Sequence, residues 1–352
     1  MKYKFFLKLF ICLSLFIFLN IFSKPIYPEV YKNYGAKNKG VAIVILGYNR
    51  PAYFKECIRS IQTNDNLDKF TFIFCIDGGR YSKQIEYRKI ILESKIKNVI
   101  FLDRLYNYGC PKNHIDSKRF AFDWCGFEKI IVLEEDIIIT PTYFTFLLNL
   151  HEWAIKKYDN IGSIQAWSYC YLSKKNKYKA LPYVVENERQ FSFVTYCMDK
   201  KTWNKISPFL YTYESYIDKI PIDGTQDKAR SKPKFWKDIR SIKNFLFNEI
   251  QHRPLLKDKD MLEASFLRSK YEERRKREYS YSLLSANQDQ VLGISFYLHG
   301  LIKLQSVVNR CIHIGEYGIT TNHESFIKHG YSKIKLDFFR EDNSLKNFLL
   351  IH

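Results

Sequence analysis

Three adjacent carboxylates, Glu134-Glu135-Asp136, are the residues in this sequence best suited to carry chemistry. Adjacent carboxylates repel one another, and a bound cation relieves that repulsion. Hard oxygen ligands of this kind suit Mg²⁺ or Mn²⁺. The triplet follows Lys129–Leu133, a run rich in β-branched residues that predicts a buried strand. A metal held there would bridge the two phosphates of a bound nucleotide and neutralise charge on that nucleotide as it departs. The competing interpretation of the triplet is a solvated acidic turn.

Two more polar clusters come at the ends of expected strands. Arg50 follows the apolar run 40–47, and Asp77 follows the run 70–76. In a parallel sheet, ligands bind beyond the carboxyl ends of the strands, so these two side chains and the acidic triplet are expected to meet at one site.

The elements that must position these residues alternate along the chain. Apolar runs typical of strands, and spacing typical of helices, predict strands at 40–47, 70–76, 98–102, 129–133 and 161–166, and helices at 53–61, 82–95, 116–127, 142–157 and 287–300, with a short apolar stretch at 302–308. Such alternation indicates an α/β fold with a mostly parallel sheet and helices on both of its faces.

The start of the chain has the pattern of a membrane anchor. Lys2, Lys4 and Lys8 precede an apolar run that reaches the lower limit of a spanning helix, about 17–25 residues. This predicts a single-pass type II protein, in the Golgi or endoplasmic reticulum lumen of a eukaryote or at a bacterial cell membrane. A cleaved signal peptide and a buried helix are the alternatives. The expected segments are an anchor at 1–23, a stem at 24–39, a catalytic domain at 40–325 with halves 40–167 and 168–325, a basic helical insertion at 211–285, and a tail at 326–352.

Composition excludes several classes of protein. The net charge is +19, but no zinc finger, basic zipper or aromatic ribonucleoprotein motif accompanies it, so we expect no nucleic-acid partner. Hydrophobic residues make up 46% of the chain, which argues against global disorder. None of the eight cysteines forms a C-x-x-C pair, so a zinc ribbon is not supported.

The segment Ile130–Phe144, with its acidic triplet and Thr140-Pro141, resembles the metal-binding signature of glycosyltransferases with the GT-A fold. It is most similar to the N-acetylglucosaminyltransferase I type and to related bacterial family 2 enzymes. Further segments of similar sequence are 44–51, 76–79, 127–128, 161–167, 287–290, 296–300, 312–315 and 322–323.

This resemblance implies roles for particular residues. It makes Asp136 the direct ligand of Mn²⁺ or Mg²⁺. The implied donor-binding residues are Glu135 at the ribose or the metal, Glu134 at the sugar, Asp77 at the uracil edge, Arg50 near the nucleotide, and Asn107, His114 and Lys118 at phosphates or base. His313 and His323 are further candidates for phosphate contact or for ordering a lid.

Asp289 resembles the catalytic base of the family, because an inverting transfer needs a carboxylate that accepts the proton of the acceptor hydroxyl. A competing interpretation is that Asn287 or Asp289 only caps a helix. Asp238, flanked by aromatic residues, is the second candidate for the base.

The function expected from these residues is metal-dependent inverting transfer of a sugar, with N-acetylglucosamine as the expected sugar, from a UDP-sugar to a hydroxyl of a glycan or glycoconjugate. The alternatives are a nucleotidyltransferase on a related sheet and a non-catalytic membrane-bound carbohydrate-binding protein. The first alternative usually needs a glycine-rich phosphate loop, and Gly47–Pro51 is poor for that purpose.

Overall fold

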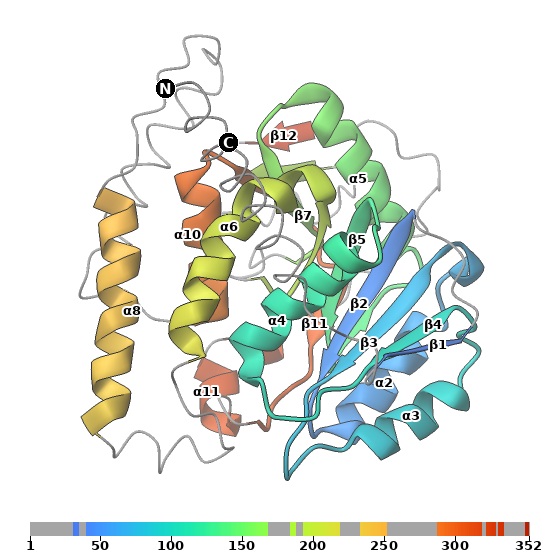
Figure 1. Cartoon of the computed structure of the whole chain (residues 1–352). Coiled ribbons are helices and arrows are strands. Elements are labelled where there is room, and N and C mark those ends of the chain that lie inside the picture. The colour runs from blue at the N-terminus through green and yellow to red at the C-terminus, as the bar shows by residue number, and fades with distance from the viewer. Residues whose placement is uncertain are drawn as a thin grey trace, which may run out of the picture.

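The computed structural model describes residues 31–34, 40–167, 184–187, 193–218, 233–251, 287–318, 322–328, 330–333 and 349–351. These residues form a ten-stranded sheet and a small two-stranded sheet, with helices on both faces of the large sheet (Figure 1). The predicted α/β class with a mostly parallel, helix-flanked sheet is confirmed.

The large sheet has the strand order β1-β4-β3-β2-β5-β9-β7-β10-β8-β12. Strands β4, β3, β2 and β5 run parallel to one another, β9 runs against both β5 and β7, and β10 runs parallel to β7. The bounds are β1 Tyr31–Tyr34, β2 Val41–Gly47, β3 Thr71–Ile76, β4 Val99–Leu102, β5 Lys129–Glu134, β7 Ile161–Gln165, β8 Val184–Asn187, β9 Thr195–Asp199, β10 Ile302–Ser306 and β12 Leu349–Ile351.

The small sheet pairs β6 (Ile137–Ile139) with β11 (Cys311–His313) in the antiparallel sense. Because β6 follows β5 after only two residues, this pairing brings a late part of the chain beside the acidic triplet. The sequence pattern did not predict either of these short strands.

The helices divide between the two faces. One face carries α2 (Pro51–Ile61), α3 (Gln84–Leu92) and α5 (Tyr143–Lys157), and the other carries α4 (Gly109–Arg119), the π-helical turn Phe120–Trp124, α6 (Lys200–Ile217) and α10 (Gln288–Leu298). Helix α8 (Pro233–Gln251) packs on α6 and α10 as an outer layer (Figure 1). The short helices are η1 Leu67–Lys69, α11 His323–Lys328 and η6 Tyr331–Lys333.

Two hydrophobic cores follow from the alternation along the central strands. In β2, Ile43 and Ile45 point into the core under α2, α3 and α5, whereas Val44 and Leu46 point into the core under α4, α6 and α10. A strand buried on both faces reads as a continuous apolar run, which explains why the sequence located β2 and β3 within one or two residues.

The helix predicted at 116–127 is the one element whose start was clearly misplaced. It begins at Gly109, seven residues before the predicted start at 116. It changes to a π-helical turn at Phe120. Glycine and proline usually interrupt a helical sequence pattern, and Gly109 and Pro111 lie in the first turn of this helix. Proline is tolerated in the first turn, however, because its missing N–H has no helical partner there.

Several expected segments lie partly or wholly outside the described residues. Within the expected insertion 211–285, the described residues 211–217 and 233–251 are helical. In the range expected for a stem, residues 31–34 form the edge strand β1, which pairs with β4. The expected anchor at 1–23 lies outside the described residues, and no helix among those that are described is long and apolar enough to span a membrane.

Candidate active site

Asp136 lies between β5, which ends at Glu134, and β6, which begins at Ile137, and its side chain is 1% exposed. Because His313 pairs with Ile137 across the small sheet, its Nε2 atom comes to 3.1 Å from Asp136 Oδ2. The backbone after His313 passes so close that a Cβ on Gly315 would stand 2.0 Å from Asp136 Oδ2. Only glycine fits at this position without displacing the carboxylate.

Arg50, just before α2, joins two members of the acidic triplet. Its Nε donates to Glu135 Oε1 at 2.6 Å, and an NH2 nitrogen lies 2.8 Å from Asp136 Oδ2. The planar guanidinium can contact both carboxylates at once, which a lysine ammonium cannot do with the same geometry. The predicted meeting of Arg50 with the triplet is therefore observed.

Both carboxylate oxygens of Glu135 accept hydrogen bonds from neighbouring residues of the protein. Its Oε2 accepts from the Tyr48 backbone N–H at 2.8 Å and from the Tyr87 hydroxyl, while Oε1 accepts from Arg50. The side chain therefore holds the loop after β2 in place against α3. Contact of Glu135 with a ribose or a metal stays a prediction.

A divalent ion fits the residues around Asp136. The Oδ1 atom of Asp136 is buried and makes no hydrogen bond among the described residues, so one carboxylate oxygen is left for a cation. The nearby His313 offers an imidazole nitrogen, and a mixed oxygen and nitrogen set favours Mn²⁺ over Mg²⁺, which takes oxygen ligands. Within the described part of the chain, no three His, Cys, Asp or Glu side chains form a complete metal cluster, so a donor diphosphate would have to supply further ligands.

The charges around Asp136 favour the ionised form of its carboxylate. Burial disfavours its charge, but His313 and Arg50 outweigh burial and lower the pKa of Asp136. For His313, burial acts to lower the pKa, but the Asp136 carboxylate has the larger effect. The net result is a raised pKa of His313. The site is thus arranged around a carboxylate that stays ionised.

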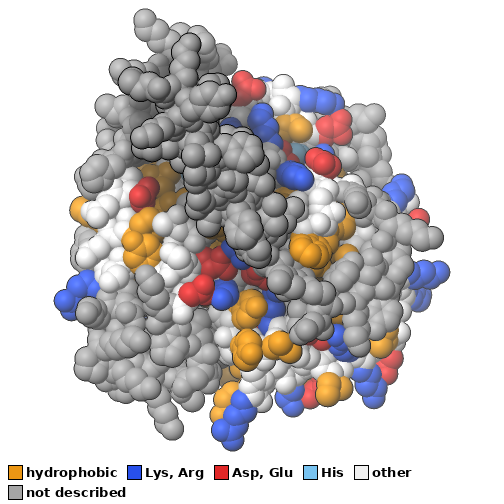
Figure 2. Space-filling model, viewed as in Figure 1, with side chains coloured by type: hydrophobic (Ala, Val, Ile, Leu, Met, Phe, Trp, Pro, Cys, Tyr) orange, Lys and Arg blue, Asp and Glu red, His pale blue; other side chains and the backbone are white. Residues whose placement is uncertain are grey.

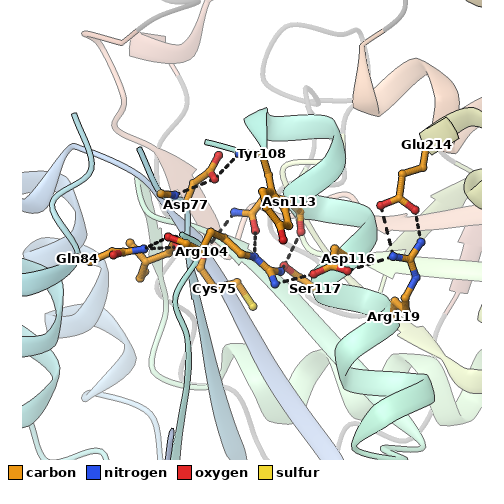
Figure 3. A network of polar contacts seen from close by, with 12 residues as sticks. Cys75, Asp77, Gln84, Arg104, Tyr108, Asn113, Asp116, Ser117, Arg119 and Glu214 are labelled. Carbon is orange, nitrogen blue, oxygen red and sulfur yellow. Dashed lines mark hydrogen bonds and ion pairs between the residues drawn. The ribbon is translucent and has the colours of Figure 1, made fainter. Parts of the chain in front are cut away.

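Asp77 anchors the loop that leads into α4. Its Oδ1 accepts from the backbone N–H groups of Gly78 at 2.9 Å and Tyr108 at 2.7 Å, and its Oδ2 accepts from Gly109 at 2.9 Å (Figure 3). A carboxylate that receives three backbone bonds fixes the start of α4 beside the end of β3. Contact of Asp77 with a uracil edge stays a prediction.

A buried ionic network continues from this loop across α4 to α6. Arg104, which follows β4, is paired with Asp116 at 2.5 Å, and Asp116 also contacts Arg119 at 3.1 Å, which in turn is paired with Glu214 (Figure 3). Arg104 also donates to Asn113 Oδ1 at 3.1 Å. The network ties the loop held by Asp77 to the helix that faces the second half of the chain.

Asp289 lies in the first turn of α10 and belongs to a second group of titratable side chains. Burial and the nearby carboxylate of Glu134 raise the pKa of Asp289 to about 7, while Lys303 and Lys118 act in the opposite direction. The Phe193 backbone N–H also donates to its carboxylate. Burial and Asp136 in turn raise the pKa of Glu134, so Glu134 interacts electrostatically with both Asp136 and Asp289.

His114 and Lys118 project from α4 into this second group, and both are 2% exposed. His114 Nε2 lies 3.4 Å from Glu134 Oε1, and Lys118 Nζ donates to the His114 carbonyl oxygen at 2.8 Å. Burial lowers the pKa of Lys118 to about 7. The structure thus brings both predicted residues to the site beside Glu134 and Asp289, and their contact with phosphates or base stays a prediction.

The competing interpretation of Asp289 as a helix cap is not supported. Asn287 is the N-cap of α10, and its Oδ1 accepts from the Gln290 N–H at 2.8 Å. Asp289 Oδ1 makes no hydrogen bond among the described residues, so the carboxylate is available for chemistry. The second candidate for the base, Asp238, lies in α8 with its side chain outside the described residues. His323 contacts Glu316 at the surface.

Two residues at the site were missed or undervalued in the sequence. Tyr87 had no signal of its own, because it looks like an ordinary apolar position of α3. His313 was only one of two candidate histidines, and the close approach of the Gly315 backbone to Asp136 is seen only in the structure. On the face drawn in Figure 2, the described acidic and basic side chains lie intermingled, without one continuous basic patch.

Comparisons with known proteins give only distant matches. No family model matches the sequence, and no curated protein matches it. Among solved structures, S. aureus TarS 1-349 in complex with UDP-GlcNAc has 14% identity and a TM-score of 0.29, with 37% of this chain and 34% of that chain covered. The present chain thus spans about a third of that structure.

Two other similar structures are named as a galactosyltransferase and a mannosyltransferase. The galactosyltransferase LgtC, in complex with donor and acceptor sugar analogues, has 14% identity, a TM-score of 0.30, and coverage of 49% of this chain and 65% of that chain. The mannosyltransferase PcManGT from Pyrobaculum calidifontis, in complex with GDP-Man and Mn²⁺, has 10% identity, a TM-score of 0.34, and coverage of 81% and 92%.

Proposed function

We propose that this chain is a metal-dependent inverting glycosyltransferase that moves a sugar, N-acetylglucosamine in the first instance, from a UDP-sugar to a hydroxyl of a glycan or glycoconjugate. The observation that carries the proposal is the placement of Glu134 between two groups of residues. On one side lie Asp136 and His313, which fit a metal, and on the other side lies Asp289, a carboxylate with a raised pKa.

The chemistry follows from these two sides. Asp136 and His313 would hold Mn²⁺, which when bound supplies positive charge against the leaving diphosphate. The oxygen of the acceptor hydroxyl attacks C1 of the sugar, the bond from C1 to the phosphate oxygen breaks, and UDP leaves. The proton of the hydroxyl passes to Asp289, whose pKa of about 7 makes it a stronger base than an ordinary aspartate.

The resemblance of the sequence to glycosyltransferases with the GT-A fold supports the same function. The proposal includes two further points. The enzyme is of the N-acetylglucosaminyltransferase I type, and residues 1–23 anchor it in a membrane. With that anchor, the catalytic domain would act at a membrane, in the Golgi or endoplasmic reticulum lumen of a eukaryote or at a bacterial cell membrane.

A donor screen tests the proposal directly. The full chain is incubated with a panel of nucleotide sugars and Mn²⁺, and release of the nucleoside diphosphate is measured for the wild type and for Asp136→Asn. We expect release from a UDP-sugar by the wild type and at least about a hundredfold less by the variant, in line with the loss of a transition-state charge contact. Equal release by both proteins would reject the site assignment.

A further inference from the structure

The imidazole of His313 is held by a polar contact on one of its two nitrogens. Its Nε2 lies 3.1 Å from Asp136 Oδ2, whereas its Nδ1 is buried and makes no hydrogen bond among the described residues. A histidine that binds a metal is usually oriented by a hydrogen bond from its second ring nitrogen to a carboxylate or a carbonyl oxygen. The described residues give His313 Nδ1 no such partner, so other contacts must orient the ring.

Two aromatic rings pack against this imidazole. The ring centroid of Tyr331 lies 5.0 Å from that of His313, with 39° between the ring planes. The ring centroid of Phe326 lies 6.0 Å from that of His313, with 32° between the planes. Both distances fall within the range of about 4.5–7 Å that is typical of attractive ring pairs. Tyr331 and Phe326 also contact each other at 5.5 Å, so the three rings form one cluster.

Tyr331 is in turn packed against a residue at the end of a strand of the large sheet. Its ring centroid lies 6.0 Å from that of Trp167, which follows β7 and is fully buried. Tyr331 is half-buried at the start of η6, and Phe326 on α11 is buried. A line of contacts therefore runs from the end of β7 through Trp167 and Tyr331 to the imidazole of His313.

The role proposed for His313 makes this support important. A ring nitrogen that gives its lone pair to a cation cannot donate a hydrogen bond at the same time. If Nε2 serves a cation, a hydrogen bond to Asp136 no longer fixes the ring, and the aromatic contacts remain. A side chain that is already oriented loses less freedom on binding, so it binds more tightly.

We propose that Tyr331 is a positioning residue for the metal site, and that its ring, with Phe326 beside it, holds the His313 imidazole in the orientation that binds a cation at Asp136. This inference rests on the proposed function, and it adds two residues that the sequence pattern assigned to a tail at 326–352. Loss of the ring at position 331 is expected to weaken binding of Mn²⁺ by about three- to tenfold.

The test measures the dissociation constant of Mn²⁺ for the full chain in saturating UDP, from the electron paramagnetic resonance signal of free Mn²⁺. Tyr331→Leu removes the ring, and Tyr331→Phe keeps the ring without the hydroxyl. Tyr158→Leu is the matched control, because Tyr158 is also half-buried and also contacts a tryptophan, Trp153, at 6.0 Å between ring centroids. We expect binding to be about three- to tenfold weaker in Tyr331→Leu and within about twofold of wild type in the other two variants.

Removal of His313 distinguishes positioning from general packing. If Tyr331 acts through His313, Tyr331→Leu should change the affinity for Mn²⁺ by less than about twofold when His313→Ala is already present. The same loss in both backgrounds, an unchanged affinity in Tyr331→Leu, or an equal loss in Tyr158→Leu would overturn the inference. Should Tyr331→Leu fail to fold, Phe326→Leu, which removes the second ring, decides by the same comparison.

The wild type separates this inference from the proposed function. If the wild type binds Mn²⁺ in the presence of UDP and Tyr331→Leu binds it equally well, the role of Tyr331 is overturned while the proposed transferase stands. If the wild type binds no Mn²⁺ in the presence of UDP, the metal-dependent function is overturned together with the role of Tyr331.

Discussion

His313 Nε2 lies 3.1 Å from Asp136 Oδ2, although the two residues come from opposite halves of the chain. The antiparallel pairing of β6 with β11 produces this contact, and Gly315 permits it by leaving no Cβ beside the carboxylate. The contact matters because it places an imidazole against a buried carboxylate whose second oxygen makes no hydrogen bond among the described residues, which is the pair of groups that the proposed metal would use.

The close approach of Gly315 predicts a sharp effect of a single methyl group. Gly315→Ala would place a Cβ 2.0 Å from Asp136 Oδ2, so either the carboxylate or the backbone after β11 must move, and the contact between Asp136 and His313 is disturbed. We expect Mn²⁺-dependent binding of UDP, measured by calorimetry, to weaken by at least about tenfold.

The control for this variant is Gly126→Ala, where a Cβ would meet nothing within 4 Å but the φ angle of 77° remains unfavourable. It should lose about 1 kcal/mol of stability and keep UDP binding, since a non-glycine residue in the left-handed region costs about 1–2 kcal/mol. Similar losses of UDP binding in both variants would show that Gly315 acts only on folding.

Asp289→Asn separates catalysis from binding. The amide has nearly the same shape but cannot accept the proton of an acceptor hydroxyl, so the rate of transfer should fall by about 10²–10⁴-fold. Binding of UDP with Mn²⁺ should stay within about twofold of wild type, because the ion pairs of Asp136 are with Arg50 and His313 and do not involve Asp289. Full transfer activity in Asp289→Asn would exclude this residue as the base.

The raised pKa of Asp289 predicts the pH dependence of the reaction. Only the ionised carboxylate accepts a proton, and half of it is ionised at about pH 7. Under conditions in which chemistry limits the rate, kcat/KM should therefore rise with pH, fall about tenfold per pH unit well below 7, and level off above 7. A profile that is already flat from pH 5 upward would mean that the base has an ordinary aspartate pKa.

The network around Arg104 predicts a large loss of stability on truncation. Arg104→Met removes a cation that is buried at 1% side-chain exposure and leaves Asp116 without that partner. Removing one partner of a buried pair costs about 3–5 kcal/mol, which urea unfolding followed by circular dichroism can measure. Lys156→Ala, which breaks the exposed pair with Glu152, should cost no more than about 0.5 kcal/mol. Equal small losses would show that the network is not a structural link between β4, α4 and α6.

The sequence predicted the parts of the fold that depend on local pattern. The apolar runs of β2 and β3 are buried on both faces, and the acidic triplet follows β5 as expected. Parallel strands carry their ends to one edge of the sheet, which is why the meeting of Arg50 with the triplet could be foreseen.

The parts that could not be predicted depend on contacts between distant segments. Strand β11 is three residues long, and nothing local shows that it pairs with β6. Similarly, the triplet alone does not reveal that Glu135 is committed to Tyr87 and Arg50 while Asp136 keeps an oxygen free. Three adjacent carboxylates look equivalent in sequence, and only their partners distinguish them.

The most direct measurement of the central claim is isothermal titration of the full chain with UDP, with and without Mn²⁺, for the wild type and for Asp136→Asn. We expect Mn²⁺ to strengthen UDP binding to the wild type by at least about tenfold and to have no effect on the variant. UDP binding that is indifferent to Mn²⁺ in the wild type, or an equal effect of Mn²⁺ in Asp136→Asn, would contradict a metal site at Asp136.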